Sequence, residues 1–136
     1  MRIVLDTNVL LAGLAMRGTC EAVVSLCLTS PDHTLVLSEH ILQEFRKHFS
    51  GKFGIPADRS HVVAEALRSH AVLVEPAAVP AGACRDPEDL PILGTLVGSA
   101  ADCLVTGDAD LLSLKQYGGR PILSPRQCYE RMKTAN

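Results

Sequence analysis

The sequence opens with Arg2-Ile3-Val4-Leu5-Asp6-Thr7-Asn8, a short apolar run that ends on a carboxylate. An apolar run of this length without polar alternation indicates a strand that is buried on both faces, as in a parallel sheet covered by helices. Further apolar runs of the same kind lie at residues 35–37, 72–74, 103–105 and 121–123. These runs predict the strands of a central parallel sheet.

Segments with a helical spacing of apolar residues separate these runs. Residues suited to begin a helix stand ahead of them: Thr19, Ser38, Pro56, Asp86 and Ser124. The start at Asp86 is the strongest, because an aspartate cap is followed by a proline at the first helical position. Alternating strands and helices predict an α/β fold, a three-layer α/β/α sandwich with a central parallel sheet. We expect a single domain over residues 1–136.

The composition sets limits on location and partners. Of the 136 residues, 47% are hydrophobic and 21% are charged, the balance of a soluble globular domain. No apolar run approaches the ~20 residues that a membrane span needs. The first apolar run is too short and too soon followed by a charge for a signal peptide. We therefore expect a cytoplasmic protein that does not bind membranes.

The net charge is −2, so the chain has no overall positive field that would attract nucleic acid. A polyanion would have to bind through a local basic patch or through bound metal. The five cysteines include no C-x-x-C pair, which argues against a disulfide framework or a zinc ribbon. Cys27 and Cys103 lie in apolar stretches and are expected to be reduced core residues.

Carboxylates follow the predicted strands at the places where such sheets bind ligands, beyond the carboxyl ends of the strands. Asp6 ends the first strand, and Asp108 and Asp110 follow the strand at 103–105. Glu44 lies on the helix after the second strand, and Asp89 lies in the first turn of the helix that begins at Asp86. We expect these side chains to meet at one edge of the sheet.

Clustered carboxylates repel one another, and a hard divalent cation removes that cost. Mg²⁺ or Mn²⁺ prefers oxygen ligands, and Mg²⁺ commonly takes one or two carboxylates and keeps several waters. A cation bound in this way can lower the pKa of a water molecule and stabilise charge on a phosphoryl oxygen. The pattern therefore favours hydrolysis of a phosphodiester.

Each of these acidic residues also has a purely structural interpretation. Asp6 and Asp86 are suitable helix caps, and Asp89 in a first helical turn is stabilised by the helix dipole alone. Glu44 could be a solvated helix residue, and aspartates such as Asp108 and Asp110 are ordinary in turns. The joint pattern is what favours a site.

Two stretches of the sequence resemble PIN-domain ribonucleases. The first is Val4-Leu5-Asp6-Thr7-Asn8-Val9. The second is Asp86-Pro87-Glu88-Asp89-Leu90-Pro91-Ile92-Leu93, followed by Ala101-Asp102-Cys103-Leu104-Val105-Thr106-Gly107-Asp108-Ala109-Asp110-Leu111-Leu112. The similarity covers essentially the whole chain and is closest to the VapC-like toxin components of bacterial toxin–antitoxin pairs.

The resemblance implies a function and a set of site residues. It implies hydrolysis of single-stranded RNA with Mg²⁺ or Mn²⁺, a small antitoxin protein as partner, and a homodimer. The residues that match the family's acidic positions, which it assigns to catalysis and metal binding, are Asp6, Glu44, Asp89 and Asp108, with Asp110 as a possible fifth metal ligand. Beside them Thr7, Asn8 and Thr106 are polar residues that can orient the carboxylates.

Pro91 departs from the family pattern, because a second proline follows the one at the helix start. It could shift the turn by one residue and exchange the roles of Glu88 and Asp89. None of the five histidines is expected to act as a base, and all are expected at the surface. Candidate contacts to RNA phosphates are Arg17, Arg46, Lys47 and Lys52. Arg46 and Lys47 also suit a purely structural role, because basic residues near a helix C-terminus favour the helix dipole.

Two other functions fit part of the pattern. One is a Mg²⁺-dependent phosphotransfer domain in which Asp6 is itself phosphorylated. Such domains have a second aspartate at the position of Asn8, or a lysine at a strand end, whereas Lys115 follows a helical segment. The other is a PIN-like interaction module that binds a partner protein without catalysis.

Overall fold

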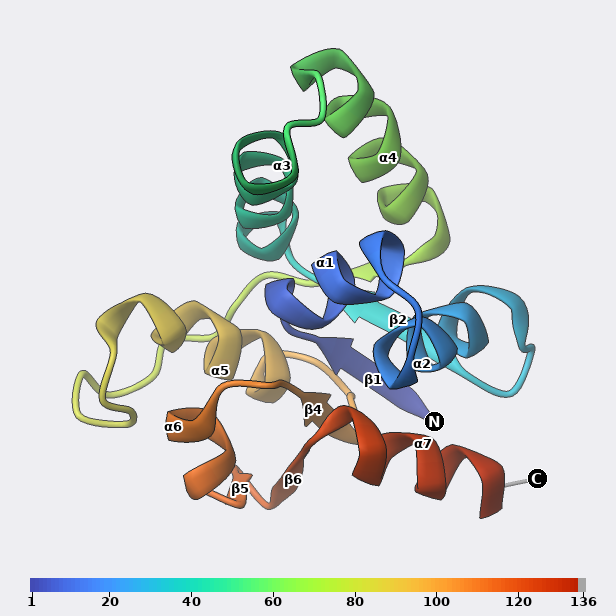
Figure 1. Cartoon of the computed structure of the whole chain (residues 1–136). Coiled ribbons are helices and arrows are strands. Elements are labelled where there is room, and N and C mark those ends of the chain that lie inside the picture. The colour runs from blue at the N-terminus through green and yellow to red at the C-terminus, as the bar shows by residue number, and fades with distance from the viewer. Residues whose placement is uncertain (135–136) are drawn as a thin grey trace.

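The computed structural model describes residues 1–134 of the chain. Strands and helices alternate along it (Figure 1). In chain order the elements are β1 (Arg2–Leu5), α1 (Thr7–Ala15), α2 (Thr19–Thr29), β2 (Thr34–Leu37), α3 (Glu39–Phe53), α4 (Ala57–His70), β3 (Val72–Leu73), the 3₁₀ turn η1 (Pro87–Asp89), α5 (Leu90–Val97), β4 (Cys103–Val105), α6 (Ala109–Ser113), β5 (Gln116–Tyr117), β6 (Arg120–Leu123) and α7 (Pro125–Thr134).

The strands form one sheet in the order β3-β2-β1-β4-β6-β5. All neighbouring pairs are parallel except β5 and β6, which are antiparallel. The mostly parallel sheet confirms the predicted α/β/α class. The β5–β6 hairpin was not predicted, because β5 has only two residues and no apolar run. Its turn uses Gly118 and Gly119, whose positive φ angles of 59° and 77° favour glycine.

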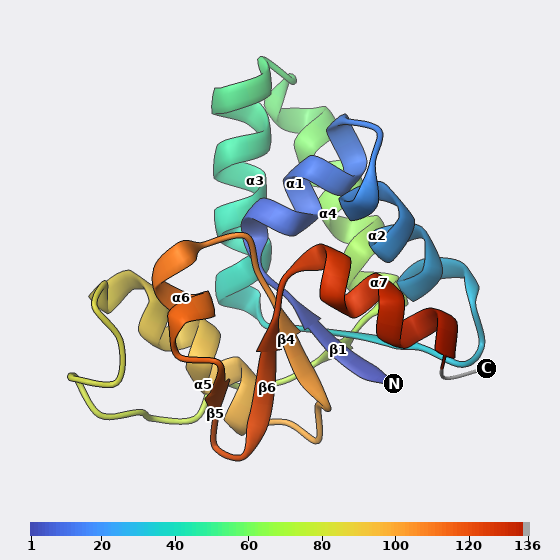
Figure 2. The same cartoon turned by 60° about the horizontal axis from the view of Figure 1, so that its bottom comes forward.

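Helices cover both faces of the sheet, as parallel connections require. Strands β1, β2 and β3 succeed one another toward one edge of the sheet, whereas β4 and β6 succeed one another toward the opposite edge. Since such crossovers are right-handed, the two halves place their helices on opposite faces. Helices α1 and α2 accordingly lie on one side of the strands and α5 and α6 on the other (Figures 1 and 2). Helix α7 follows the last strand and is not part of a crossover; it packs against α2.

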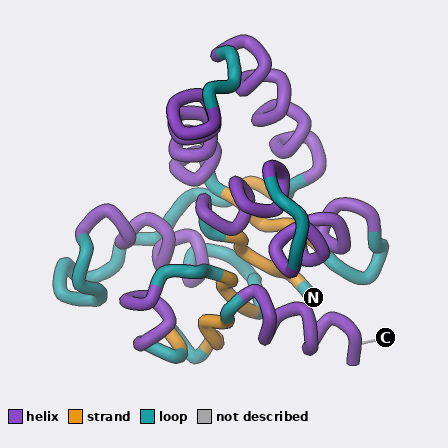
Figure 3. The backbone as a smooth tube through the Cα atoms, in the orientation of Figure 1, coloured by secondary structure: helices purple, strands orange, loops and turns teal. Residues whose placement is uncertain are grey.

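Helices α3 and α4 form a hairpin that extends away from the sheet (Figures 1 and 3). Ser38 caps α3 by accepting a hydrogen bond from the amide of Ile41, and α3 ends at Gly54, whose φ of 65° is left-handed. Inside the hairpin Phe45 and Phe49 stack with ring centroids 4.9 Å apart.

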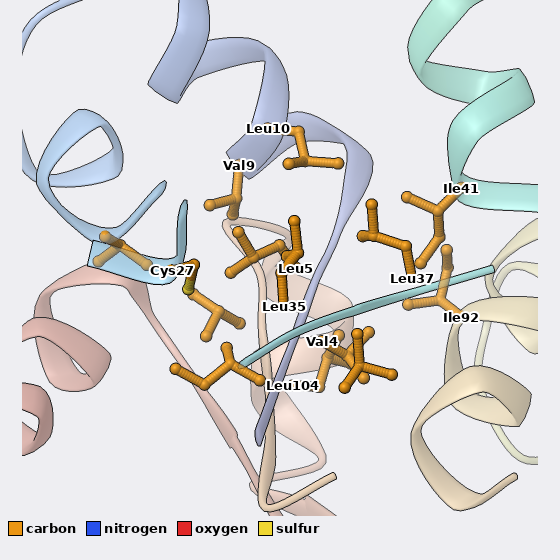
Figure 4. Packing of buried hydrophobic residues seen from close by; sticks show 14 of the residues in the cluster. Val4, Leu5, Val9, Leu10, Cys27, Leu35, Leu37, Ile41, Ile92 and Leu104 are labelled. Atoms are coloured by element: carbon orange, nitrogen blue, oxygen red, sulfur yellow. The ribbon is translucent and has the colours of Figure 1, made fainter. Parts of the chain in front are cut away.

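The core lies on both sides of the central strands. Ile3, Val4 and Leu5 are fully buried, and Figure 4 shows Leu5 beside Val9 and Leu10 of α1. The prediction of a buried strand at residues 72–74 was wrong in one respect: Val72 and Leu73 form β3 but are 38% and 39% exposed. Among residues 1–134, β2 is the sole strand with which the edge strand β3 pairs.

All five cysteines are free thiols, and Cys27 and Cys103 are buried as predicted. Among the described residues, no single helix has the length and apolar character to cross a membrane. Helices α1 and α2 meet such a test only when taken together, and they are bent by 97° relative to each other.

Candidate metal centre

The candidate site lies between β1 and β4, where the order of the strands in the sheet reverses. Strands β1 and β4 are neighbours, yet the chain leaves them toward opposite edges of the sheet. Such a point leaves a crevice outside the carboxyl ends of the two strands. A pocket of about 340 Å³ opens there. Its lining consists of Asp6, Thr7, Asn8, Leu11, His40, Glu44, His48, Lys52, Asp86, Glu88, Asp89, Ile92 and Asp108.

Asp6 is the most buried carboxylate of the pocket and is 7% exposed. It caps α1, with Oδ1 accepting a hydrogen bond from the amide of Thr7 at 2.7 Å. Its Oδ2 accepts one from the hydroxyl of Thr106 at 2.7 Å. Burial raises the pKa of Asp6 above its ordinary value, and these two hydrogen bonds oppose that rise. Asp6 is therefore held in one orientation in a site that disfavours its charge.

Thr106 joins the ends of β1 and β4. Its hydroxyl is fully buried, donates to Asp6, and accepts a hydrogen bond from the amide of Asp108 at 3.0 Å. Asp108 in turn caps α6 through the amide of Asp110. Beside them the side-chain oxygen of Asn8 accepts a hydrogen bond from the amide of Gly107 at 3.4 Å. The two strand ends thus position Asp6 and Asp108 against each other.

Asp89 lies at a break between two helical turns. Asp86 caps the 3₁₀ turn η1 through the amide of Glu88 at 3.0 Å, and α5 begins at Leu90 with Pro91 as its second residue. A proline is tolerated at this point because the amides of a first turn have no helical partner. Pro91 therefore lies in the first turn of α5, a separate helix that begins after η1.

The break brings Asp89 to the other aspartates. Burial, followed by the charges of Asp108, Asp6 and Asp86, raises the pKa of Asp89 to about 7. Glu88 also lines the pocket but is exposed. Of Glu88 and Asp89, Asp89 is the carboxylate whose repulsion by neighbouring charges a bound cation would relieve.

Glu44 faces the pocket from α3 and is the outlying carboxylate of the group. Its side chain is 31% exposed. Its charge also raises the pKa of Asp6, but less than burial or the charge of Asp108 does. The Glu44 carboxylate lies 3.1 Å from Nε2 of His48 and 3.8 Å from Nε2 of His40.

The expectation that all histidines lie at the surface was wrong for His33, and the lining of the pocket by His40 and His48 was not predicted. His40 and His48 line the pocket, and His33 is 5% exposed with its ring 3.3 Å from the amino terminus. The signal that could have found the first two is their spacing of four residues on either side of Glu44, which places them on the same face of the helix.

Asp110 and the four candidate RNA contacts differ in whether they line the pocket. Asp110 is outside its lining and faces Arg85, with 3.8 Å between Oδ1 and Nη1. Of the candidate RNA contacts, Lys52 lines the pocket, whereas Arg46 and Lys47 line a separate hollow between α3 and α4. Arg17 is exposed between α1 and α2 and lines neither.

The pocket is lined by carboxylate oxygens, the type of ligand that a hard divalent cation prefers. Three aspartates line it from η1 and from beyond the ends of two strands, and burial, followed by the charges of Asp108 and Asp6, raises the pKa of Asp89. Within the described residues, however, no group of three or more such side chains lies close enough together to hold a metal ion.

Fold and site together define an α/β protein with a carboxylate cluster at the switch point of its sheet. The model of the PIN domain family matches residues 2–110. The chain belongs to this family. No curated protein sequence is significantly similar to the chain.

Solved structures of similar fold come from toxin–antitoxin systems. VapBC-1 from nontypeable Haemophilus influenzae has a TM-score of 0.61 at 20% identity, with 93% of this chain and 99% of that one covered. VapBC2 from Rickettsia felis, bound to a DNA fragment from its promoter, has a TM-score of 0.60 at 14% identity, covering 91% and 98%. Mycobacterium tuberculosis VapC20, a sarcin-ricin loop cleaving toxin, has a TM-score of 0.57 at 17% identity, covering 88% and 99%. At these identities the likeness is one of fold.

Proposed function

We propose that the protein is a metal-dependent ribonuclease that hydrolyses single-stranded RNA. The observation that carries the proposal is the convergence of Asp6, Asp89 and Asp108 at the switch point, with the pKa of Asp89 raised to about 7. Buried carboxylates of like charge are costly for a fold unless a cation or a reaction uses them. Membership of the PIN family supports the choice of a nuclease.

Asp6, Asp89 and Asp108 would hold Mg²⁺ or Mn²⁺, with Glu44 facing the same space from α3. When bound, the cation supplies an activated water and stabilises charge on the phosphoryl oxygens. The chain contributes orientation: Thr106 and Thr7 keep both oxygens of Asp6 in place, and Thr106 ties Asp6 to Asp108. Asp110, engaged with Arg85 outside the pocket, would bind only if that contact opened.

The RNA strand would enter along α3. Lys52 is the lysine that lines the pocket, and its charge can meet a phosphate next to the one that is cut. Arg46 and Lys47 face the far side of α3 and would meet only a strand that crosses the helix. Arg17 is exposed between α1 and α2, lines neither hollow, and is therefore the weakest of the four candidates.

We further propose that the protein is the toxin of a toxin–antitoxin pair and acts as a homodimer. The similarity in fold to VapC toxins, two of them in VapBC complexes, supports an antitoxin partner. Growth arrest on expression, relieved by a small protein encoded next to the gene, is the expected result. Equilibrium sedimentation would check the homodimer. Normal growth at full expression would contradict the toxin assignment.

The ribonuclease assignment is tested with purified protein and a labelled single-stranded RNA. Cleavage is expected with Mg²⁺ or Mn²⁺ and not with a chelator. Phosphorylation of Asp6 by a small phosphodonor, without cleavage, would favour the phosphotransfer alternative instead. A calorimetric titration that finds no binding of either cation would favour the interaction module and contradict both enzymatic functions.

A further inference from the structure

Two histidines flank Glu44 on the pocket side of α3. His40 precedes Glu44 by four residues and His48 follows it by four, so each ring is one helical turn away from the carboxylate. Nε2 of His48 lies 3.1 Å from Oε2 of Glu44, and Nε2 of His40 lies 3.8 Å from Oε1. Each carboxylate oxygen therefore faces a different imidazole ring.

The chemistry of the closer contact assigns its donor. A carboxylate can only accept a hydrogen bond, so Nε2 of His48 must carry the hydrogen. The neutral ring does so in one of its two tautomers, and the contact does not require a charged histidine. Nε2 of His40, 3.8 Å from the other oxygen, is too far away for a hydrogen bond and would attract that oxygen only when the ring is charged.

The orientation of the Glu44 carboxylate depends on histidine rings, whereas Asp6 and Asp108 are oriented by other groups. Asp6 is held by a backbone amide and a threonine hydroxyl, and Asp108 accepts from a backbone amide. Among the described residues, the rings of His40 and His48 supply the contacts to Glu44, and no backbone amide or hydroxyl reaches it. A glutamate on a solvent-facing helix otherwise samples several rotamers, and ordering it has an entropic cost.

We infer that His40 and His48 are positioning residues that hold the Glu44 carboxylate toward the pocket, one ring on either side. They act through Glu44 and not on the RNA. The consequence for catalysis rests on the proposed ribonuclease function, whereas the contact itself can be tested without any activity.

The first test observes the rings directly in the metal-free protein. Long-range ¹⁵N–¹H spectra distinguish the two tautomers of a neutral histidine. We expect His48 in the Nε2–H form, and we expect Glu44→Gln to shift the signals of His48 and His40 but not those of His61, an exposed histidine on α4. Ring signals that do not respond to Glu44→Gln would overturn the inference, whether or not the protein cleaves RNA.

The second test uses cleavage kinetics. His48→Ala should lower kcat about tenfold, the loss of one hydrogen bond to a charged group, and leave KM nearly unchanged. His48→Gln, whose amide can donate to the same oxygen, should recover most of the loss. His40→Ala should have a smaller effect, and His61→Ala should have none.

The same substitutions in a Glu44→Ala background separate positioning from substrate contact. If His48 acts through Glu44, then His48→Ala causes no further loss there, because the two changes are coupled. A full loss in that background, or a rise in KM in place of a fall in kcat, would mean that the ring contacts the RNA and would overturn the inference. Absence of RNA cleavage by the unaltered protein would contradict the proposed function and leave the spectroscopic test decisive.

Discussion

Asp6 and Glu44 face the same pocket but are held there in different ways. Asp6 belongs to a wall made by the strand ends and η1, where Asp89 and Asp108 are its neighbours and Thr106 ties the parts together. We call this the strand-edge wall. Glu44 belongs to a wall made by one face of α3, together with His40, His48 and Lys52. We call this the α3 wall.

The two walls differ in burial and in charge. The strand-edge wall gathers aspartates in a partly desolvated space, which raises the pKa of Asp6 and of Asp89. The α3 wall places nitrogen groups around a single carboxylate that stays 31% exposed. The difference teaches that a bound cation would relieve the charge repulsion of the strand-edge wall, whereas the α3 wall has groups that can orient Glu44.

The largest effect is expected from the strand-edge wall itself. Asp6→Asn removes the most buried carboxylate and should lower RNA cleavage by roughly 10²–10³-fold, the size typical for loss of one electrostatic group in an active site. The fold should persist, because the substitution removes a desolvated charge. Cleavage rates and circular dichroism check both points. Asp58→Asn on the exposed start of α4 is the matched control, and equal losses in the two variants would refute the assignment.

Thr106→Val tests how the strand-edge wall is assembled. The variant leaves Oδ2 of Asp6 buried without its donor and the amide of Asp108 without its acceptor. We expect a loss of about 1–3 kcal/mol in the free energy of unfolding, measured by urea denaturation. Thr106→Ser keeps the hydroxyl and should lose much less. A valine variant as stable as the serine variant would show that the hydrogen bonds contribute little.

The charge of the strand-edge wall should appear in the pH dependence of stability. The pKa of Asp89 is about 7 in the fold against an ordinary 3.8, so between these values the folded state binds more protons than the unfolded state. Stability of the metal-free protein should therefore fall as the pH rises through this range. Solvent screening keeps the effect modest because Asp89 is only half-buried.

Thermal unfolding at a series of pH values measures this fall. Asp89→Asn should flatten it, and a saturating concentration of Mg²⁺ should do the same, because the cation neutralises the wall. Glu75→Gln, in the loop before η1, should leave it unchanged. A stability that rises steadily from pH 4 to pH 7 would contradict the raised pKa.

The smallest effect is expected on the α3 wall. Lys52→Ala removes one cation from the pocket rim and should weaken RNA binding a few-fold. The slope of log K against log salt should drop by about 0.7, the value for one phosphate of a single strand. Arg17→Ala, away from the pocket, should change the slope less. Equal slopes for the unaltered protein, Lys52→Ala and Arg17→Ala would mean that Lys52 does not contact a phosphate.

The two walls also differ in how far the sequence predicts them. The strand-edge wall could be predicted, because Asp6 directly follows β1, Asp108 comes three residues after the end of β4, and parallel strands end at the same edge of a sheet. Asp89 could be expected there from its place at a helix start. The α3 wall was missed in part, since His40 and His48 look like surface residues until the direction of the helix is known.

By itself, then, the sequence determined the local elements: apolar runs that must be buried as strands, caps that begin helices, and carboxylates placed next to strand ends. Tertiary structure alone decided which face of α3 turns toward the pocket, that Pro91 begins a new helix beside Asp89, and that β3 stays exposed at an edge. The reason is physical. Helix caps and the spacing of apolar residues depend on neighbours in sequence, whereas the pKa of Asp89 and the side of α3 that faces the pocket depend on residues that only the folded chain brings together.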